Sequence, residues 1–241
     1  MSNTETSDSR WKDLYKVGGA ASLVSAVFIP IQVIVFIAWP PPSTPIGWFT
    51  LFQNNKLIGL IDLDLLLVAD NVLLIPIFLA IYVALRRASE SVMAIATALG
   101  VVGIVLFIAS NPAFEMLSLS NQYAAATTDA QRSIFLAAGQ AMLAPWQGTA
   151  FQAAYVIGSV VGIAIGTVML RSAIFGKLTA YTGILGNAVG LGYYVPTIGI
   201  YISVFSVVFL EIWYILIALR LFQLGQDISR NPQRRLGDAA G

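Results

Sequence analysis

Long uncharged apolar stretches dominate this sequence and limit what it can fold into. Between Val17 and Phe222 the chain is almost continuously apolar, interrupted mainly by glycine, proline and short basic clusters. Only 10% of its residues are charged, against roughly a quarter in a soluble domain. About 20 apolar residues are enough for an α-helix to cross the hydrocarbon core of a bilayer. Because backbone polar groups in lipid must be satisfied within the segment, we predict an all-α polytopic membrane helix bundle.

Six stretches have the length and hydropathy of transmembrane helices. We predict one transmembrane domain over residues 17–222, preceded by a cytoplasmic segment with an interfacial helix (1–16) and followed by a basic cytoplasmic tail (223–241). The motif from Thr128 to Gln131 has the spacing of a capping box, which predicts an outer amphipathic helix over 129–144 between spans three and four. The six spans are expected at residues 17–39, 57–85, 91–110, 146–170, 178–195 and 200–219.

The distribution of basic residues predicts the orientation. If the six spans alternate, 11 Lys and Arg residues fall on one side of the membrane and 2, Lys56 and Arg132, fall on the other. Basic residues accumulate on the cytoplasmic side, so both termini are expected there.

The absence of cysteine and histidine removes several kinds of chemistry. It excludes disulfides, Cys/His zinc sites, Cys or His haem ligation and every Ser/His or Cys/His nucleophile pair. Basic residues are scattered between spans, so no face is suited to nucleic-acid phosphates. We therefore expect no enzymatic activity, no cofactor and no nucleic-acid partner.

Glycines in the fourth and fifth spans predict close helix packing. Helices in lipid associate through small residues that let their backbones approach, and a repeat of four places such residues on one face. We expect spans four and five to pack on two strips, formed by Gly158, Gly162 and Gly166 and by Gly186 and Gly190.

Acids within the apolar stretches are the candidates for chemistry. Glu211 lies near the middle of span six and Asp70, beside Asn71, lies in span two, and an intramembrane acid is a functional candidate by default. Asp62 and Asp64, near the outer boundary of span two, more often have a structural role; on a continuous helix their side chains diverge, which disfavours a shared metal. The predicted polar site consists of Asp70, Asn71, Asn111, Glu115, Gln147 and Glu211.

Aromatic residues near the predicted outer boundary are expected to form an interfacial belt. Its predicted members are Trp39, Trp48, Trp146, Tyr193 and Tyr194, with Phe49 and Phe52 near the same boundary.

The chain also resembles a bacterial six-spanning membrane family known only as a domain of unknown function. The resemblance rests on residues 109–118 (ASNPAFEMLS), 122–127 (QYAAAT), 146–150 (WQGTA) and 216–225 (LIALRLFQLG). It implies a six-spanning fold in the cytoplasmic (inner) membrane of a bacterium and favours the corner from Asn111 to Glu115 as an outer site, but it implies no activity.

Two functions fit these features best, and a third, a lipid-modifying enzyme that uses hard-metal or carboxylate chemistry, is weaker because the sequence shows no ligand spacing for it. The first is binding or transport of a small cationic or protonatable solute through an acid-lined cavity, with Glu211 and Asp70 holding a charge or a proton. The alternative is a non-catalytic membrane subunit or sensor that acts through helix and outer-loop contacts, as an oligomer or with a partner membrane protein. Membrane lipids are expected partners in either case.

Overall fold

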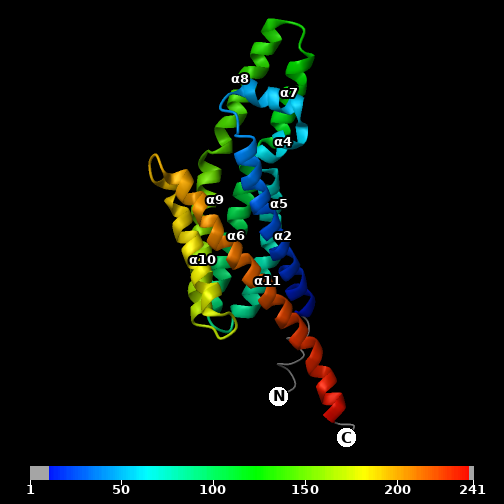
Figure 1. Ribbon diagram of the computed structural model, residues 1–241, viewed down its shortest axis with the longest axis vertical. Coiled ribbons are helices and arrows are strands. Elements are labelled where there is room, and N and C mark those ends of the chain that lie inside the picture. Colours follow the sequence, from blue (N-terminus) through cyan, green and yellow to red (C-terminus); the bar gives the residue numbers. More distant parts are fainter. Residues whose placement is uncertain (1–10, 239–241) are drawn as a thin grey trace. The chain divides into compact units, whose positions relative to one another are not determined.

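A computed structural model describes residues 11–238, and this part of the chain is all-helical, with 86% helix and no strand (Figure 1). Within residues 11–238, five helical segments are long and apolar enough to cross a membrane: Lys12–Ala38, Leu65–Leu85, Glu90–Ala125, Asp129–Leu170 and Gly199–Ile228. The helices are α2 (Lys12–Ala38), α3 (Pro45–Asn54), α4 (Lys56–Asp62), α5 (Leu65–Leu85), α6 (Glu90–Ser110), α7 (Ala113–Ala125), α8 (Asp129–Trp146), α9 (Thr149–Leu170), α10 (Lys177–Gly190), the 3-10 helix η1 (Leu191–Tyr194) and α11 (Gly199–Asp238). The predicted segment 1–16 lies mostly outside the described residues, as do the last three residues of the predicted tail.

The long helices expose apolar side chains outward. Ile37 is 74% exposed, Ile95 61% and Val208 54%, on three different helices. In water such surfaces would be unfavourable, whereas against lipid tails they have no cost. This pattern and the five long apolar helices indicate a multi-pass membrane protein.

The chain forms two compact units, and α2, α5, α6 and α9 each contribute residues to both. Unit 1 comprises Met1–Ala26, Leu73–Val101 and Gly158–Gly241, and unit 2 comprises Val27–Val72 and Val102–Ile157.

In unit 1, α10 and α11 form an antiparallel hairpin (Figure 1). At one end of the hairpin, the Arg220 side chain donates a hydrogen bond from Nε to the carbonyl of Ile174, in the loop before α10. At the other end, Gly192 of η1 lies against Ile202 near the start of α11. The α2 helix joins the hairpin through Ser22 Oγ, which donates to the carbonyl of Tyr214 at 2.8 Å.

In unit 2, the short helices α3, α4, α7 and α8 enclose an aromatic core. Trp48, Phe49 and Phe52 of α3 are at most 1% exposed and pack with Leu63, Ala113 and Met116. The Trp48 ring meets the Trp146 ring edge-on, with centroids 5.5 Å apart. The expectation that Trp48, Phe49 and Phe52 line a membrane interface is therefore wrong. Because Thr44 caps α3 and Pro45 opens it, the chain after the proline-rich stretch forms a helix that turns these rings inward.

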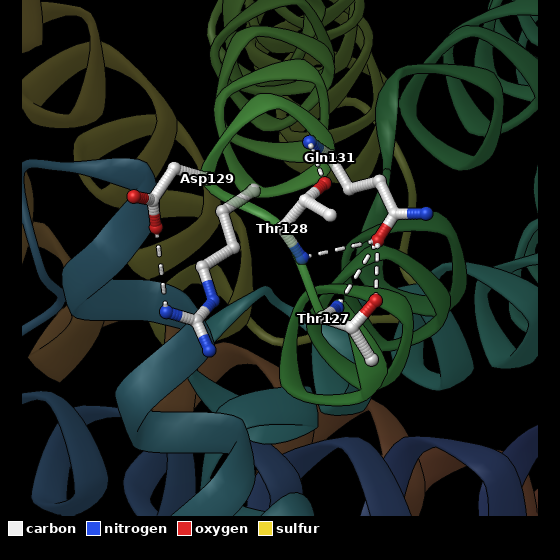
Figure 2. A network of polar contacts seen from close by, with 5 residues as sticks. Thr127, Thr128, Asp129 and Gln131 are labelled. Atoms are coloured by element: carbon white, nitrogen blue, oxygen red, sulfur yellow. Dashed lines mark hydrogen bonds and ion pairs between the residues drawn. The ribbon is translucent and has the colours of Figure 1, made fainter.

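The predicted capping box opens α8, as Figure 2 shows. Gln131 donates its backbone N–H to Thr128 Oγ1 at 3.2 Å, and its side-chain Oε1 accepts from the backbone N–H of Thr128 at 3.4 Å and of Thr127 at 3.1 Å. Asp129 and Arg132 form an ion pair at 3.7 Å. The helix predicted at 129–144 is confirmed and extends to Trp146; its place outside the membrane stays a prediction.

Two predicted spans differ from the structure. The second is not continuous: α4 ends at Asp62 and α5 begins at Leu65, so the span predicted from residue 57 starts eight residues later. The fifth has about the predicted length but is not one regular helix, because α10 ends after 14 residues and continues as the four-residue 3-10 helix η1.

Candidate functional site

The break between α4 and α5 is a tight turn formed by residues 61–64, here called the Asp62–Asp64 turn. Leu63 leaves the helical region with φ −89° and ψ 34°, and Asp64 has a φ of 63°. A positive φ is rare for residues other than glycine, and aspartate is among those that tolerate it best. The Asp64 N–H donates to the Ile61 carbonyl at 2.9 Å, and the α-helical pattern resumes when Val68 N–H donates to the Asp64 carbonyl.

Two side chains from distant segments hydrogen-bond the backbone of this turn. Gln32 of α2 donates from Nε2 to the Ile61 carbonyl at 2.9 Å, and Asn111 donates from Nδ2 to the Leu63 carbonyl. A helix break leaves carbonyl groups without their usual partners, and burying them unpaired is costly. Asn111 supplies a donor to the Leu63 carbonyl, and Gln32 adds a second donor to the Ile61 carbonyl, so the turn is fixed from two sides.

Asp62 is the last residue of α4 and is fully buried, with 0% of its surface exposed. Neither of its carboxyl oxygens accepts a hydrogen bond from any residue in the described part of the chain. Burial raises the pKa of Asp62 from its ordinary 3.8 to about 6. A charged carboxylate is strongly disfavoured in such surroundings, so this group favours a bound proton or a compensating cation.

Asp64 is also buried, and it has one strong partner. The Trp146 indole donates from Nε1 to Asp64 Oδ2 at 2.7 Å, which connects the turn to the end of α8. Burial is the main reason that the pKa of Asp64 is raised to about 7. The hydrogen bond from Trp146 lowers the pKa in part, and the neighbouring Asp62 charge raises it further. Gln32, Asn111 and Trp146, the side chains that hydrogen-bond the turn, are all neutral. Two coupled acids with pKa values near neutrality can bind and release protons at physiological pH.

The acids predicted deeper in the apolar stretches lie in different units. Asp70 of α5 is 5% exposed and belongs to unit 2, six residues beyond Asp64. Its neighbour Asn71 donates to the carbonyl of Leu67 on its own helix at 2.9 Å. Glu211 is half-buried on α11 and belongs to unit 1.

The three outer members of the predicted site have separate environments within unit 2. Asn111 supports the turn and also accepts from the Ala113 N–H at 3.1 Å, which caps α7. Pro112 breaks the helix there, so Asn111 and Glu115 do not share one continuous helical face. Glu115 is exposed and lines a groove between α7 and α8, and Gln147 is exposed where α8 ends.

The predicted packing glycines have unequal surroundings. A side chain at Gly162 would meet Asn187 of α10, and one at Gly166 would lie 2.7 Å from Ile184 on the same helix, whereas Gly158 has no such neighbour within 4 Å. In α10, Gly186 lies against Leu210 of α11. Gly190 is buried at the end of α10.

Sequence reasoning missed Gln32 and undervalued Asp62, Asp64 and Trp146. Gln32 is the only Gln, Asn or charged residue between Val17 and Trp39, and this isolation was an available signal. The sequence predicts a continuous helix through Asp62 and Asp64, on which the two side chains would point in different directions. The broken helix and the burial of the turn change that judgement.

Within the described residues, no group of three or more Asp, Glu, His or Cys side chains could hold a metal ion. No family model, curated protein or solved structure matches the chain. The resemblance to a six-spanning family of unknown function therefore stays a prediction, and the functional argument depends on the site itself.

Proposed function

We propose that this multi-pass membrane protein binds a proton or a small cation at the Asp62–Asp64 turn, as part of binding or moving a small cationic or protonatable solute. The observation that carries the proposal is the Asp62 carboxyl group, fully buried and without a hydrogen-bond donor among the described residues. An ionised carboxylate in that position would lose its hydration and gain no protein partner in return. Binding a proton or a cation removes this penalty.

The position of the turn supports coupling to the membrane-spanning helix. Asp64 directly precedes α5, a candidate span, and Asp70 follows about 9 Å further along it at about 1.5 Å per residue. A proton or cation captured at the turn thus has a second buried acid on the same helix. We propose Asp70 as the next carboxyl group in the route, and Glu211 as a separate acid in unit 1 that the solute-uptake test must assess.

We also propose that the protein crosses the membrane six times. The Arg220–Ile174 hydrogen bond places the start of α10 level with the last apolar turns of α11, and Gly192 lies beside Ile202 at the other end. This alignment of α10 with α11 supports a sixth crossing beside α11. The α10 helix and η1 supply about 21 Å and about 8 Å of rise, close to the roughly 30 Å of a hydrocarbon core.

The basic segments of unit 1 support cytoplasmic termini. The Arg86 guanidinium lies 5.8 Å from the centre of the Trp11 ring, and Gly225 of α11 lies against Lys12 and Lys16 of α2. The basic residues that follow α5 and those that begin α2 therefore lie together, and the end of α11 lies with them. Basic residues gathered at one end of a bundle favour the cytoplasmic side, and we propose the bacterial cytoplasmic membrane as the location.

Infrared difference spectroscopy of the protein in lipid nanodiscs tests proton binding directly. Between about pH 5 and pH 8 we expect a carboxylic-acid C=O band to disappear as Asp62 and Asp64 ionise, and we expect Asp62→Asn to remove part of that band. Glu115→Gln, at an exposed acid of the same unit, is the matched control and should leave the buried band intact. A wild-type spectrum without a titrating buried acid band would contradict proton binding, and sodium- or calcium-dependent shifts in its place would indicate a cation.

Solute movement and topology need separate measurements. In proteoliposomes we expect Asp62→Asn, Asp70→Asn and Glu211→Gln to reduce proton-coupled uptake of cationic solutes, and unchanged uptake in all three variants would remove the transport role. The chain contains no cysteine, so single cysteines at Ser172 and Ile198 can be labelled from either side of the membrane. Six crossings require these two positions to react from opposite sides.

A further inference from the structure

A groove in unit 2 lies between α7 and α8, away from the Asp62–Asp64 turn in sequence. Its volume is about 490 Å³. Pockets of roughly 300 to 1,000 Å³ are typical of sites for drug-sized molecules, so the groove is large enough for a small ligand. The residues that line it include Phe114, Glu115, Ser118 and Leu119 of α7 and Ala138 and Met142 of α8.

The walls of the groove are mainly apolar. Phe114 is 62% exposed and has much of its ring uncovered. Leu119, Met142 and the small Ala138 add aliphatic and thioether surface. The exposed Phe114 ring forms part of the lining of the groove, where a ligand can cover it.

Glu115 provides the only charge among the lining residues. Its carboxylate makes no hydrogen bond or ion pair with any side chain that the structure describes. The polar neighbours in the groove are already engaged with each other, since Gln122 donates to Ser118 Oγ at 3.3 Å. One negative charge beside an aromatic ring and aliphatic walls is complementary to one positive charge on an apolar body. The ring face attracts a cation as well, when the charge lies within about 6 Å of its centre.

We propose that the groove between α7 and α8 binds a small lipophilic monocation, such as a quaternary ammonium compound with an aromatic body. The ammonium lies beside Glu115 and Phe114, and the apolar body lies on Leu119, Ala138 and Met142. A lipid acyl chain would leave the carboxylate without a partner, and an anionic headgroup would be repelled by it. This binding does not depend on proton uptake at Asp62.

Photoaffinity labelling of the full chain in nanodiscs tests the inference. The probe is a benzophenone that carries a trimethylammonium group, and its neutral counterpart carries a tert-butyl group of the same shape. We expect the charged probe to label peptides from 114–122 and 138–142, and tetraphenylphosphonium to compete for these sites. Glu115→Gln should weaken binding of the charged probe by about twofold to fivefold, as expected for one exposed charge pair, and leave the neutral probe unchanged.

Two further variants separate binding in the groove from general partition into lipid. Glu90→Gln is matched to Glu115→Gln, because both residues are exposed glutamates in the first turn of a helix, and it should have no effect. Ala138→Trp should fill the groove and abolish labelling by both probes, with unchanged circular dichroism showing that the fold persists. Labelling confined to the lipid-facing helices, or equal labelling by both probes in wild-type protein, would overturn the proposal.

Discussion

Replacing Asp62 with asparagine should change how the stability of the protein depends on pH. The wild-type carboxyl group has a raised pKa in the folded protein, about 6 against an ordinary 3.8. Between these two values the unfolded chain releases the proton while the folded protein keeps it. The free energy of unfolding therefore falls as the pH rises through this window, and the contribution of Asp62 becomes constant by about pH 8.

The size of the effect follows from the pKa shift. A pKa raised from 3.8 to about 6 corresponds to a change of about 3 kcal/mol in the free energy of unfolding. Most of this change occurs between about pH 4 and pH 8. Asparagine keeps the size of the side chain and carries no titrating charge. The buried amide N–H groups of the asparagine would lack hydrogen-bond acceptors, which can lower the free energy of unfolding by about 1 to 3 kcal/mol. That loss does not vary with pH. The pH slope, rather than the absolute stability, isolates the carboxyl group.

Equilibrium unfolding in mixed micelles, followed by circular dichroism at about pH 4, 6 and 8, measures this slope. We expect the loss of stability between pH 4 and pH 8 to be about 2 to 3 kcal/mol smaller in Asp62→Asn than in the wild type. Asp64 continues to titrate in the variant, so some slope should remain. Identical slopes in the two proteins would refute the view that a buried, proton-binding carboxyl group occupies this position.

Three further changes test other parts of the structure by the same unfolding measurement. Trp146→Phe removes the indole donor to Asp64 and should destabilise the protein by about 1 to 3 kcal/mol at neutral pH; no loss would show that the hydrogen bond contributes little. Gly166→Leu introduces a side chain whose first carbon has an α10 atom 2.7 Å away and should cost about 1 to 3 kcal/mol, whereas Gly158→Leu, with no such neighbour within 4 Å, should cost less. Thr128→Ala removes the capping-box acceptor and should cost about 1 kcal/mol, unless α8 is held by its packing alone.

The features that the sequence predicts well are those determined by neighbouring residues. The all-helical fold follows from long apolar runs, because lipid permits few other backbone arrangements. The opening of α8 follows from Thr128 and Gln131, three residues apart, since the capping box is a local motif. Both predictions needed only the chemistry of a short segment.

The features that the sequence did not predict depend on contacts between distant segments. Hydropathy alone makes residues 57–85 a single helix, and the break at Leu63 is stabilised by Gln32 and Asn111, which lie 29 residues from Ile61 and 48 from Leu63. Likewise, a tryptophan beside a predicted membrane boundary is typical of an interfacial residue. The burial of Trp48 and its packing against Trp146 show that it is a core residue. Neither pairing leaves a periodic signal in the sequence.

The choice of an acid rather than a neutral side chain at this turn is the strongest reason to give it a chemical role. At position 64 an asparagine would adopt the left-handed backbone equally well and could accept the Trp146 hydrogen bond through its amide oxygen, without a titrating charge. At position 62 no described residue donates to the carboxyl oxygens, so an apolar side chain would fill the same space without a desolvation penalty. Other residues would therefore stabilise the fold better than aspartate at both positions. What only a carboxyl group adds is the ability to exchange a proton or to bind a cation, and burial next to the start of α5 brings that exchange into the physiological pH range.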